Sequence, residues 1–185
     1  MIFENGGATT DLYEISGELV RGLPGELSDP YAPDRPWTRA VTERLFEMGK
    51  ARNLLVFCHG SPGREWLLDV VWMVEKERKI VFAVESEWGG PKPVEDDFDK
   101  LMSIKAQRKL LLFSTKNHKG ADAIIGKLEA NMRAYPYHLA GEEYMLLEVT
   151  APGAFRYYFK VPSDGRQDDV TFEEVGNLLS WPWKP

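Results

Sequence analysis

The sequence predicts an α/β fold in which a mixed β-sheet is flanked by helices. Two segments, 66–74 and 80–87, carry apolar residues on both faces, as central strands do when helices cover both faces of a sheet. A third apolar run, 109–114, stands between two segments with helical spacing of apolar residues, 96–107 and 121–134. The 185 residues, 43% of them hydrophobic and 28% charged, are enough for one domain with a full core.

The first part of the chain differs in character from the rest. Residues 1–36 are rich in glycine and proline, and we expect them to form an N-terminal arm. Within this arm, one short strand or helix is expected around 11–20, and the choice between them stays open. A single α/β domain is then expected to span 37–185.

The domain is expected to open with a helix and a strand. The helix covers 37–50, because Pro36 suits a first turn and the apolar residues behind it follow the helical period. This apolar stripe consists of Val41, Leu45 and Met48. A strand over 53–58 follows, and the glycines and proline of 59–64 predict a turn.

The charged segment EKERK joins strands 66–74 and 80–87 as a hairpin loop. An aspartate at position 96 or 97 is then expected to cap a helix that ends near 107. Its stripe consists of Phe98, Leu101, Met102 and Lys105. The remaining elements are strand 109–114, helix 121–134, an antiparallel pair at 144–150 and 155–161, and a loosely packed tail at 178–185. The expected order is αβββαβαββ.

Three carboxylates are predicted to share one end of the hairpin. If Val74 faces Ile80, Asp69 lies opposite Glu85, and the alternation of side chains places Glu87 on the same face. Opposed like charges destabilise a sheet, so a cation or a proton is expected to neutralise them. Carboxylate oxygens are the ligands that Mg²⁺ and Mn²⁺ prefer. Acidic residues at strand ends that are only solvated remain the alternative.

The segments WLLDVVWMV, IVFAVESEW and DDFDKLMSIKAQRKLLLF resemble the PD-(D/E)XK nuclease superfamily, which has the restriction-endonuclease-like fold. The resemblance covers about residues 37–114. It implies that Asp69 and Glu85 bind Mg²⁺ or Mn²⁺, which activates water for hydrolysis of a phosphodiester bond in DNA or RNA. It also implies an additional acid from the preceding helix, for which Glu43 and Glu47 are the candidates.

The sequence departs from the family pattern at the lysine. Glu87 stands where the family has a lysine, so that the motif reads E-S-E, and Glu87 is expected to bind metal or position water. The resemblance then implies a lysine supplied by the following helix, either Lys100 or Lys105. We favour Lys105 because it shares the apolar stripe of that helix, whereas Lys100 lies nearer the helix start.

Two functions remain open at this point. The first is a metal-dependent nuclease, and the second is a non-catalytic member of the same fold that serves as a binding or assembly module. The net charge of -6 argues against a strong basic footprint for nucleic acid, although a local basic patch or a bound metal can outweigh it. The missing lysine of the E-x-K motif also favours the second function. A homo-oligomer or a protein partner stays open as well.

Localisation is expected from what the sequence lacks. Cys58 is the only cysteine, so no internal disulfide can form. No long apolar run is present, and the first residues lack the basic and apolar regions of a signal peptide. These features predict a cytoplasmic protein that does not enter a membrane.

Overall fold

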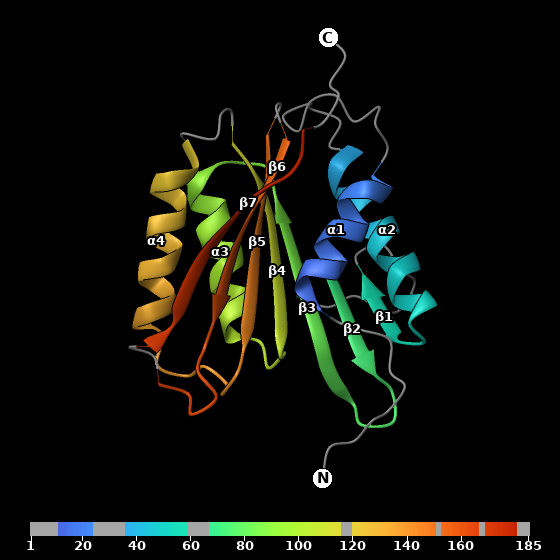
Figure 1. The fold of residues 1–185 in the computed structure, drawn as a ribbon. Coiled ribbons are helices and arrows are strands. Elements are labelled where there is room, and N and C mark those ends of the chain that lie inside the picture. The colour runs from blue at the N-terminus through green and yellow to red at the C-terminus, as the bar shows by residue number, and fades with distance from the viewer. Residues whose placement is uncertain are drawn as a thin grey trace.

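A computed structural model describes residues 11–23, 36–58, 67–115, 120–150, 153–166 and 169–180. These residues form four helices and seven strands. The strands make one mixed sheet, and the helices cover both of its faces (Figure 1). The elements are α1 (Leu12–Gly22), α2 (Pro36–Ala51), β1 (Leu55–Cys58), β2 (Val70–Val74), β3 (Lys79–Glu87), α3 (Pro91–Ser103), β4 (Arg108–Ser114), α4 (Ala121–Ala134), β5 (Glu143–Thr150), β6 (Gly153–Lys160) and β7 (Thr171–Ser180).

The strands lie in the sheet in the order in which they occur along the chain, from β1 to β7. The pairs β3–β4 and β4–β5 are parallel, and the other pairs are antiparallel. A parallel pair needs a crossover, which α3 supplies between β3 and β4 and α4 supplies between β4 and β5. The carboxyl ends of β3, β4 and β5 therefore meet at one edge of the sheet.

Each face of the sheet has its own core. Trp72 and Val84 face α1 and α2, whereas their strand neighbours Val71 and Ala83 face α3 and α4. Figure 1 shows the two helix pairs on opposite sides of the sheet. The prediction of a mixed sheet with helices on both faces is confirmed, and so is the prediction that β2 and β3 are central strands covered on both faces.

The segment around 11–20, for which either a strand or a helix was expected, is a helix, α1. Asp11 caps it, because its side chain accepts a hydrogen bond from the backbone N–H of Glu14. Ile15 and Leu19 are fully buried against the sheet. This part of the expected arm therefore contributes to the core, while residues 1–10 and 24–35 lie outside the described residues.

The β2–β3 hairpin has a different turn from the predicted one. Val74 pairs with Lys79 rather than Ile80, and a bulge after Trp72 shifts the register by one residue. Beyond the bulge, Trp72 pairs with Phe82 and Val70 with Val84, as the predicted register requires. The strand begins at residue 70 rather than 66, so Asp69 lies just outside it.

Helix α3 begins and ends earlier than predicted. The segment expected to be a loop is its first turn, in which prolines are tolerated because the first backbone N–H groups have no partner within the helix. Gly90 precedes it with a φ of 107°, a conformation that favours glycine. Phe98, Leu101 and Met102 are buried as predicted. The prediction that Lys105 belongs to this helix is wrong, because α3 ends at Ser103.

The chain ends in a strand that the sequence analysis did not predict. Residues 178–185 were expected to pack loosely, but 178–180 belong to β7, which pairs along β6 as the last strand of the sheet, while 181–185 lie outside the described residues. The ring of Phe172 lies 5.0 Å from that of Phe159 and 6.3 Å from that of Tyr157. The observed order is therefore ααβββαβαβββ, one helix and one strand more than expected.

A buried polar network ties β4 to β5 at the amino ends of these strands. The ammonium of Lys109 donates to Glu142 Oε1 at 2.8 Å and to the Tyr144 hydroxyl at 2.9 Å. The Tyr144 hydroxyl in turn donates to Glu142 Oε2 at 2.8 Å, and His138 Nδ1 lies 3.0 Å from that oxygen. Lys109 is completely buried. Such a network is stable only because each charge is paired.

None of the described helices has both the length and the apolar composition required to cross a bilayer.

Candidate active site at the end of β3

A pocket of about 300 Å³ lies at the carboxyl end of β3. Its lining residues come from β3, α3, the start of α2 and the segment before β2. They are Thr38, Leu67, Leu68, Asp69, Glu85, Ser86, Glu87, Trp88, Asp97 and Lys100. The three carboxylates predicted from the sequence all line this pocket, and α3 adds an acid and a lysine.

Asp69 is the residue just before β2, and its side chain binds β3 near the carboxyl end of that strand. Its Oδ2 accepts hydrogen bonds from the backbone N–H of Ser86 at 2.9 Å and from the Ser86 hydroxyl at 2.6 Å. The carboxylate therefore takes the place of a strand partner beside the end of β3. Burial raises the pKa of Asp69, and the two hydrogen bonds from Ser86 oppose that rise.

Glu85 is the most deeply buried acid of the pocket, with 3% of its surface exposed. Its Oε2 accepts a hydrogen bond from the backbone N–H of Asp69 at 3.2 Å, so the expected neighbourhood of the two acids is confirmed. Its Oε1 is buried and accepts no hydrogen bond. Burial, followed by the charges of Asp69 and Asp97, raises the pKa of Glu85 to about 8.

Lys100 supplies the positive charge of the pocket. Its Nζ lies 3.4 Å from Glu85 Oε1, an ion-pair distance, and 2.6 Å from Asp97 Oδ1. The hydrogen bond to Asp97 is the main cause that raises the pKa of Lys100, with a smaller contribution from Glu85. The lysine is therefore an ammonium group held between the side chains of Asp97 and Glu85.

Glu87 lies at the rim of the pocket, as expected from the alternation of side chains along β3. Its Oε1 accepts a hydrogen bond from the backbone N–H of Gly89. This contact turns one oxygen toward the start of α3. Glu87 is thus part of the pocket wall without contacting the Lys100 ammonium.

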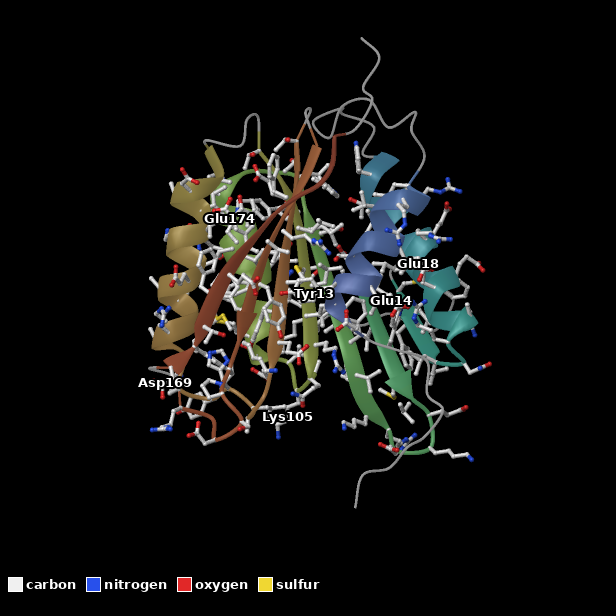
Figure 2. All side chains as sticks on the ribbon, viewed as in Figure 1. Tyr13, Glu14, Glu18, Lys105, Asp169 and Glu174 are labelled. Carbon is white, nitrogen blue, oxygen red and sulfur yellow. The ribbon has the colours of Figure 1, made fainter. Side chains whose placement is uncertain are left out.

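The structure separates the other candidates from the pocket. Lys105, the favoured lysine, is exposed between the end of α3 and the start of β4, at the opposite end of the parallel strands, as Figure 2 shows. Glu43 and Glu47 are exposed on α2, where Glu43 pairs with Arg39 at 2.7 Å. From α2, Thr38 reaches the pocket instead. The geometry therefore selects Lys100 over Lys105 and brings in neither acid of α2.

Asp97 is the pocket residue that the sequence analysis missed. It was considered only as a helix cap, because the start of α3 was placed at residue 96 or 97. With α3 beginning at Pro91, Asp97 lies in the helix interior, three residues after the buried Val94 and four before the buried Leu101. This periodicity placed Asp97 on the buried side of the helix and was the signal available in the sequence.

The donor set of the pocket fits a hard divalent cation that keeps part of its water shell. Among the described side chains, no three acidic, histidine or cysteine residues are already arranged around one point. Mg²⁺, however, is commonly bound by one or two carboxylates together with water. Asp69 and Glu85 supply two carboxylates, and the buried Oε1 of Glu85 accepts no hydrogen bond, with the Lys100 ammonium 3.4 Å away as its ion-pair partner. These two residues would therefore hold the cation.

No protein-family model matches the chain, and no curated protein matches it either. Fold and site together define a mixed α/β domain with an acidic pocket that contains one lysine at the carboxyl end of a central strand. Any function must therefore be argued from the chemistry of this pocket.

Proposed function

We propose that this protein is a nuclease of the PD-(D/E)XK type that hydrolyses phosphodiester bonds in DNA or RNA with Mg²⁺ or Mn²⁺. The observation that carries the proposal is the position of Lys100. Its ammonium lies 3.4 Å from Glu85 Oε1, next to the acid pair formed with Asp69. A lysine beside two acids, one on β3 and one just before β2, supplies the charges that this reaction needs.

The arrangement of the central elements supports the proposal. From α2 to β4, the chain runs as helix, three antiparallel strands, helix and a fourth strand parallel to the third. This order is compatible with the restriction-endonuclease-like fold, which we propose for residues 36–114. The two acids lie where the second and third of these strands separate.

Four charged residues of the pocket have roles in the proposed reaction. Asp69 and Glu85 would hold the divalent cation, which would supply Lewis-acid chemistry for activating water and for neutralising charge on the phosphate. Lys100 donates hydrogen bonds to the negative charge that develops on the phosphate oxygens in the transition state. Glu87, at the pocket rim, accepts a hydrogen bond from the attacking water and orients it. The E-S-E motif is thus complemented by a lysine from α3.

A second function is favoured by a different observation. Asp69 Oδ2 already accepts two hydrogen bonds from Ser86, and Lys100 already contacts Glu85 and Asp97. A pocket whose polar side chains are held by one another also suits a binding or assembly module without catalytic activity. The net charge of -6 points in the same direction.

Cleavage assays distinguish the two functions. Purified protein is incubated with labelled single-stranded and double-stranded DNA and RNA in Mg²⁺, in Mn²⁺ and in EDTA. We expect cleavage that depends on metal, that is lost in Glu85→Gln and that is retained in Glu129→Gln. The control removes one negative charge from an exposed pair on α4, where Glu129 contacts Arg133 at 2.8 Å. If the wild type cleaves none of the four substrates with either metal, the binding module replaces the nuclease.

A further inference from the structure

Asp97 and Lys100 form a pair within α3 that lies in the wall of the pocket. They are three residues apart, so their side chains are neighbours on the helix surface, and Lys100 Nζ lies 2.6 Å from Asp97 Oδ1. The Asp97 side chain is 13% exposed, whereas that of Lys100 is 49% exposed. The carboxylate is therefore the fixed member of the pair and the ammonium is the mobile one.

A second pair on the same helix has no such relation to the pocket. Lys92 and Asp96 are four residues apart and their charged groups are 2.5 Å apart, but both side chains are largely exposed. Asp96 is the immediate neighbour of Asp97 and carries the same charge. It therefore offers a matched control for any variant of Asp97.

The position of Lys100 depends on this fixed partner. A lysine side chain has four rotatable carbon bonds, and one that is half exposed samples many positions in water. The contact with Asp97 restricts the ammonium to positions near Glu85 Oε1, where it lies 3.4 Å away. Correct placement of a charged group is itself a large part of catalysis.

We propose that Asp97 is a positioning residue that holds the Lys100 ammonium beside Glu85. Its consequence for catalysis rests on the proposed nuclease function, whereas the restriction of Lys100 does not. A direct role of Asp97 as a metal ligand is the alternative, and it makes different predictions for metal affinity and for the double variant.

A double-mutant cycle tests the catalytic consequence. Asn at position 97 keeps the shape and an acceptor oxygen but loses the charge, so Asp97→Asn should lower kcat by about 10- to 100-fold through misplacement of the lysine and leave KM nearly unchanged. The Asp97→Asn/Lys100→Ala double variant should be no slower than Lys100→Ala, because Asp97 acts only through Lys100. Asp96→Asn should be as fast as the wild type. Additive losses in the double variant would overturn the proposal.

Metal affinity separates positioning from ligation. Calorimetric titration with Mn²⁺ should give a Kd for Asp97→Asn within about threefold of the wild type, whereas loss of a group that binds the cation or orients its ligands weakens binding by about tenfold or more. The latter result would show that Asp97 acts on the cation site rather than on Lys100 and would overturn the proposal. Asp97→Glu keeps the charge on a longer side chain and should recover part of the lost kcat. It provides a second test of the positioning role if Asp97→Asn fails to fold.

A third measurement does not depend on nuclease activity. The ¹H–¹⁵N NMR signal of the Lys100 ammonium, assigned by its absence in Lys100→Met, should be detectable in the wild type because its hydrogen bond slows proton exchange with water. The signal should be lost in Asp97→Asn and kept in Asp96→Asn. An unchanged signal in Asp97→Asn would overturn the positioning role. A wild type without cleavage activity would overturn only the proposed function.

Discussion

Lys100 Nζ lies 3.4 Å from Glu85 Oε1, a buried carboxylate oxygen that accepts no hydrogen bond. Glu85 lies near the end of β3, and Lys100 lies on α3, the next element in the chain. The lysine that the E-S-E motif lacks on the strand is thus present one element later. The same contact sets up the predictions for activity, metal binding and pH dependence.

Lys100→Ala should abolish most of the proposed nuclease activity, while Lys105→Ala should not change it. Removing one donor to the developing charge in a transition state lowers the rate by about 10²- to 10³-fold. Lys105 is exposed at the far end of the parallel strands and cannot reach the pocket. Single-turnover cleavage rates of the two variants measure the difference. Equal losses in both would remove Lys100 from its assigned role.

Without metal, stability should fall as the pH rises toward 8. The pKa of Glu85 is raised from 4.5 to about 8, so between these values the folded protein holds a proton that the unfolded chain has released. The stabilisation is therefore complete below pH 4.5 and is lost as the pH rises through about 8. Urea unfolding at several pH values in EDTA should show this slope, and Glu85→Gln should flatten it. A slope that is the same in Glu85→Gln would contradict the assignment.

With a divalent metal bound, stability should rise with pH instead of falling. Mn²⁺ binds the ionised carboxylates, so its stabilising effect grows with pH as protons are released. At 100 times its Kd, a ligand of the native state stabilises by about 2.7 kcal/mol, which corresponds to roughly 5–10 °C in Tm for a chain of this size. The Asp69→Asn/Glu85→Gln double variant should not respond, while Glu129→Gln should respond like the wild type. Thermal scans with and without Mn²⁺ measure both.

Breaking the buried ion pair between Lys109 and Glu142 should lower the unfolding free energy much more than breaking the surface pair between Arg133 and Glu129. Glu142→Gln leaves the Lys109 ammonium buried without a charged partner, which costs about 3–5 kcal/mol in unfolding free energy. Glu129→Gln removes one partner of a surface pair and should cost less than about 1 kcal/mol. Chemical denaturation of both variants gives the comparison, and similar losses would contradict it.

Replacing two helical glycines by alanine should change the unfolding free energy in opposite directions. A Cβ at Gly49 of α2 would lie 2.6 Å from Trp72 Nε1 and 2.6 Å from Val56 Cγ2, both in the buried core. Overpacking of this kind costs about 1–3 kcal/mol, so Gly49→Ala should be destabilising. A Cβ at Gly126 of α4 would meet open space, so Gly126→Ala should stabilise by about 0.5–1 kcal/mol. Unfolding free energies of the two variants should therefore change in opposite directions.

Periodicity was sufficient for the core of the fold. The bounds of α4 agree with the prediction, and the doubly apolar segments are the central strands β2 and β3. These elements were predictable because burial on one or both faces imposes a pattern on the sequence itself. By contrast, the pattern of β7 is weak, since it contains adjacent glutamates and Gly176 with a φ of 77°. Its pairing with β6 is a tertiary interaction that local sequence does not encode.

The acid pair was predicted through a register that was only partly correct. The turn was placed one residue away from its true position, and the bulge after Trp72 restored the expected pairing toward Val70. Bulges depend on the balance of packing across two strands and leave no fixed sequence signal. Asp69 and Glu85 therefore came together as expected although the turn beside Val74 did not.

Lys105 was favoured because the helix was placed too late in the sequence. Prolines at the start of α3 were interpreted as a loop, which moved the expected helix end to 107 and put Lys105 on the helix. The same shift hid Asp97, which appeared to be a capping residue. An error of one turn at a helix start thus exchanged one site residue for another.

The agreement between strand order and chain order has a consequence for synthesis on the ribosome. Each strand that emerges can pair with the strand made just before it, so the sheet can grow at one edge from β1 toward β7. Helix α1 precedes the other described elements but packs on β5, and its Tyr13 ring lies 5.1 Å from that of Tyr158 on β6, where Arg156 donates to the Tyr13 carbonyl. We expect hydrogen exchange in α1 to stay fast in stalled nascent chains that end before β5 and to slow once β5 and β6 have left the exit tunnel; early protection would contradict this. A helix that precedes every described strand is then stabilised only by strands made near the end of synthesis.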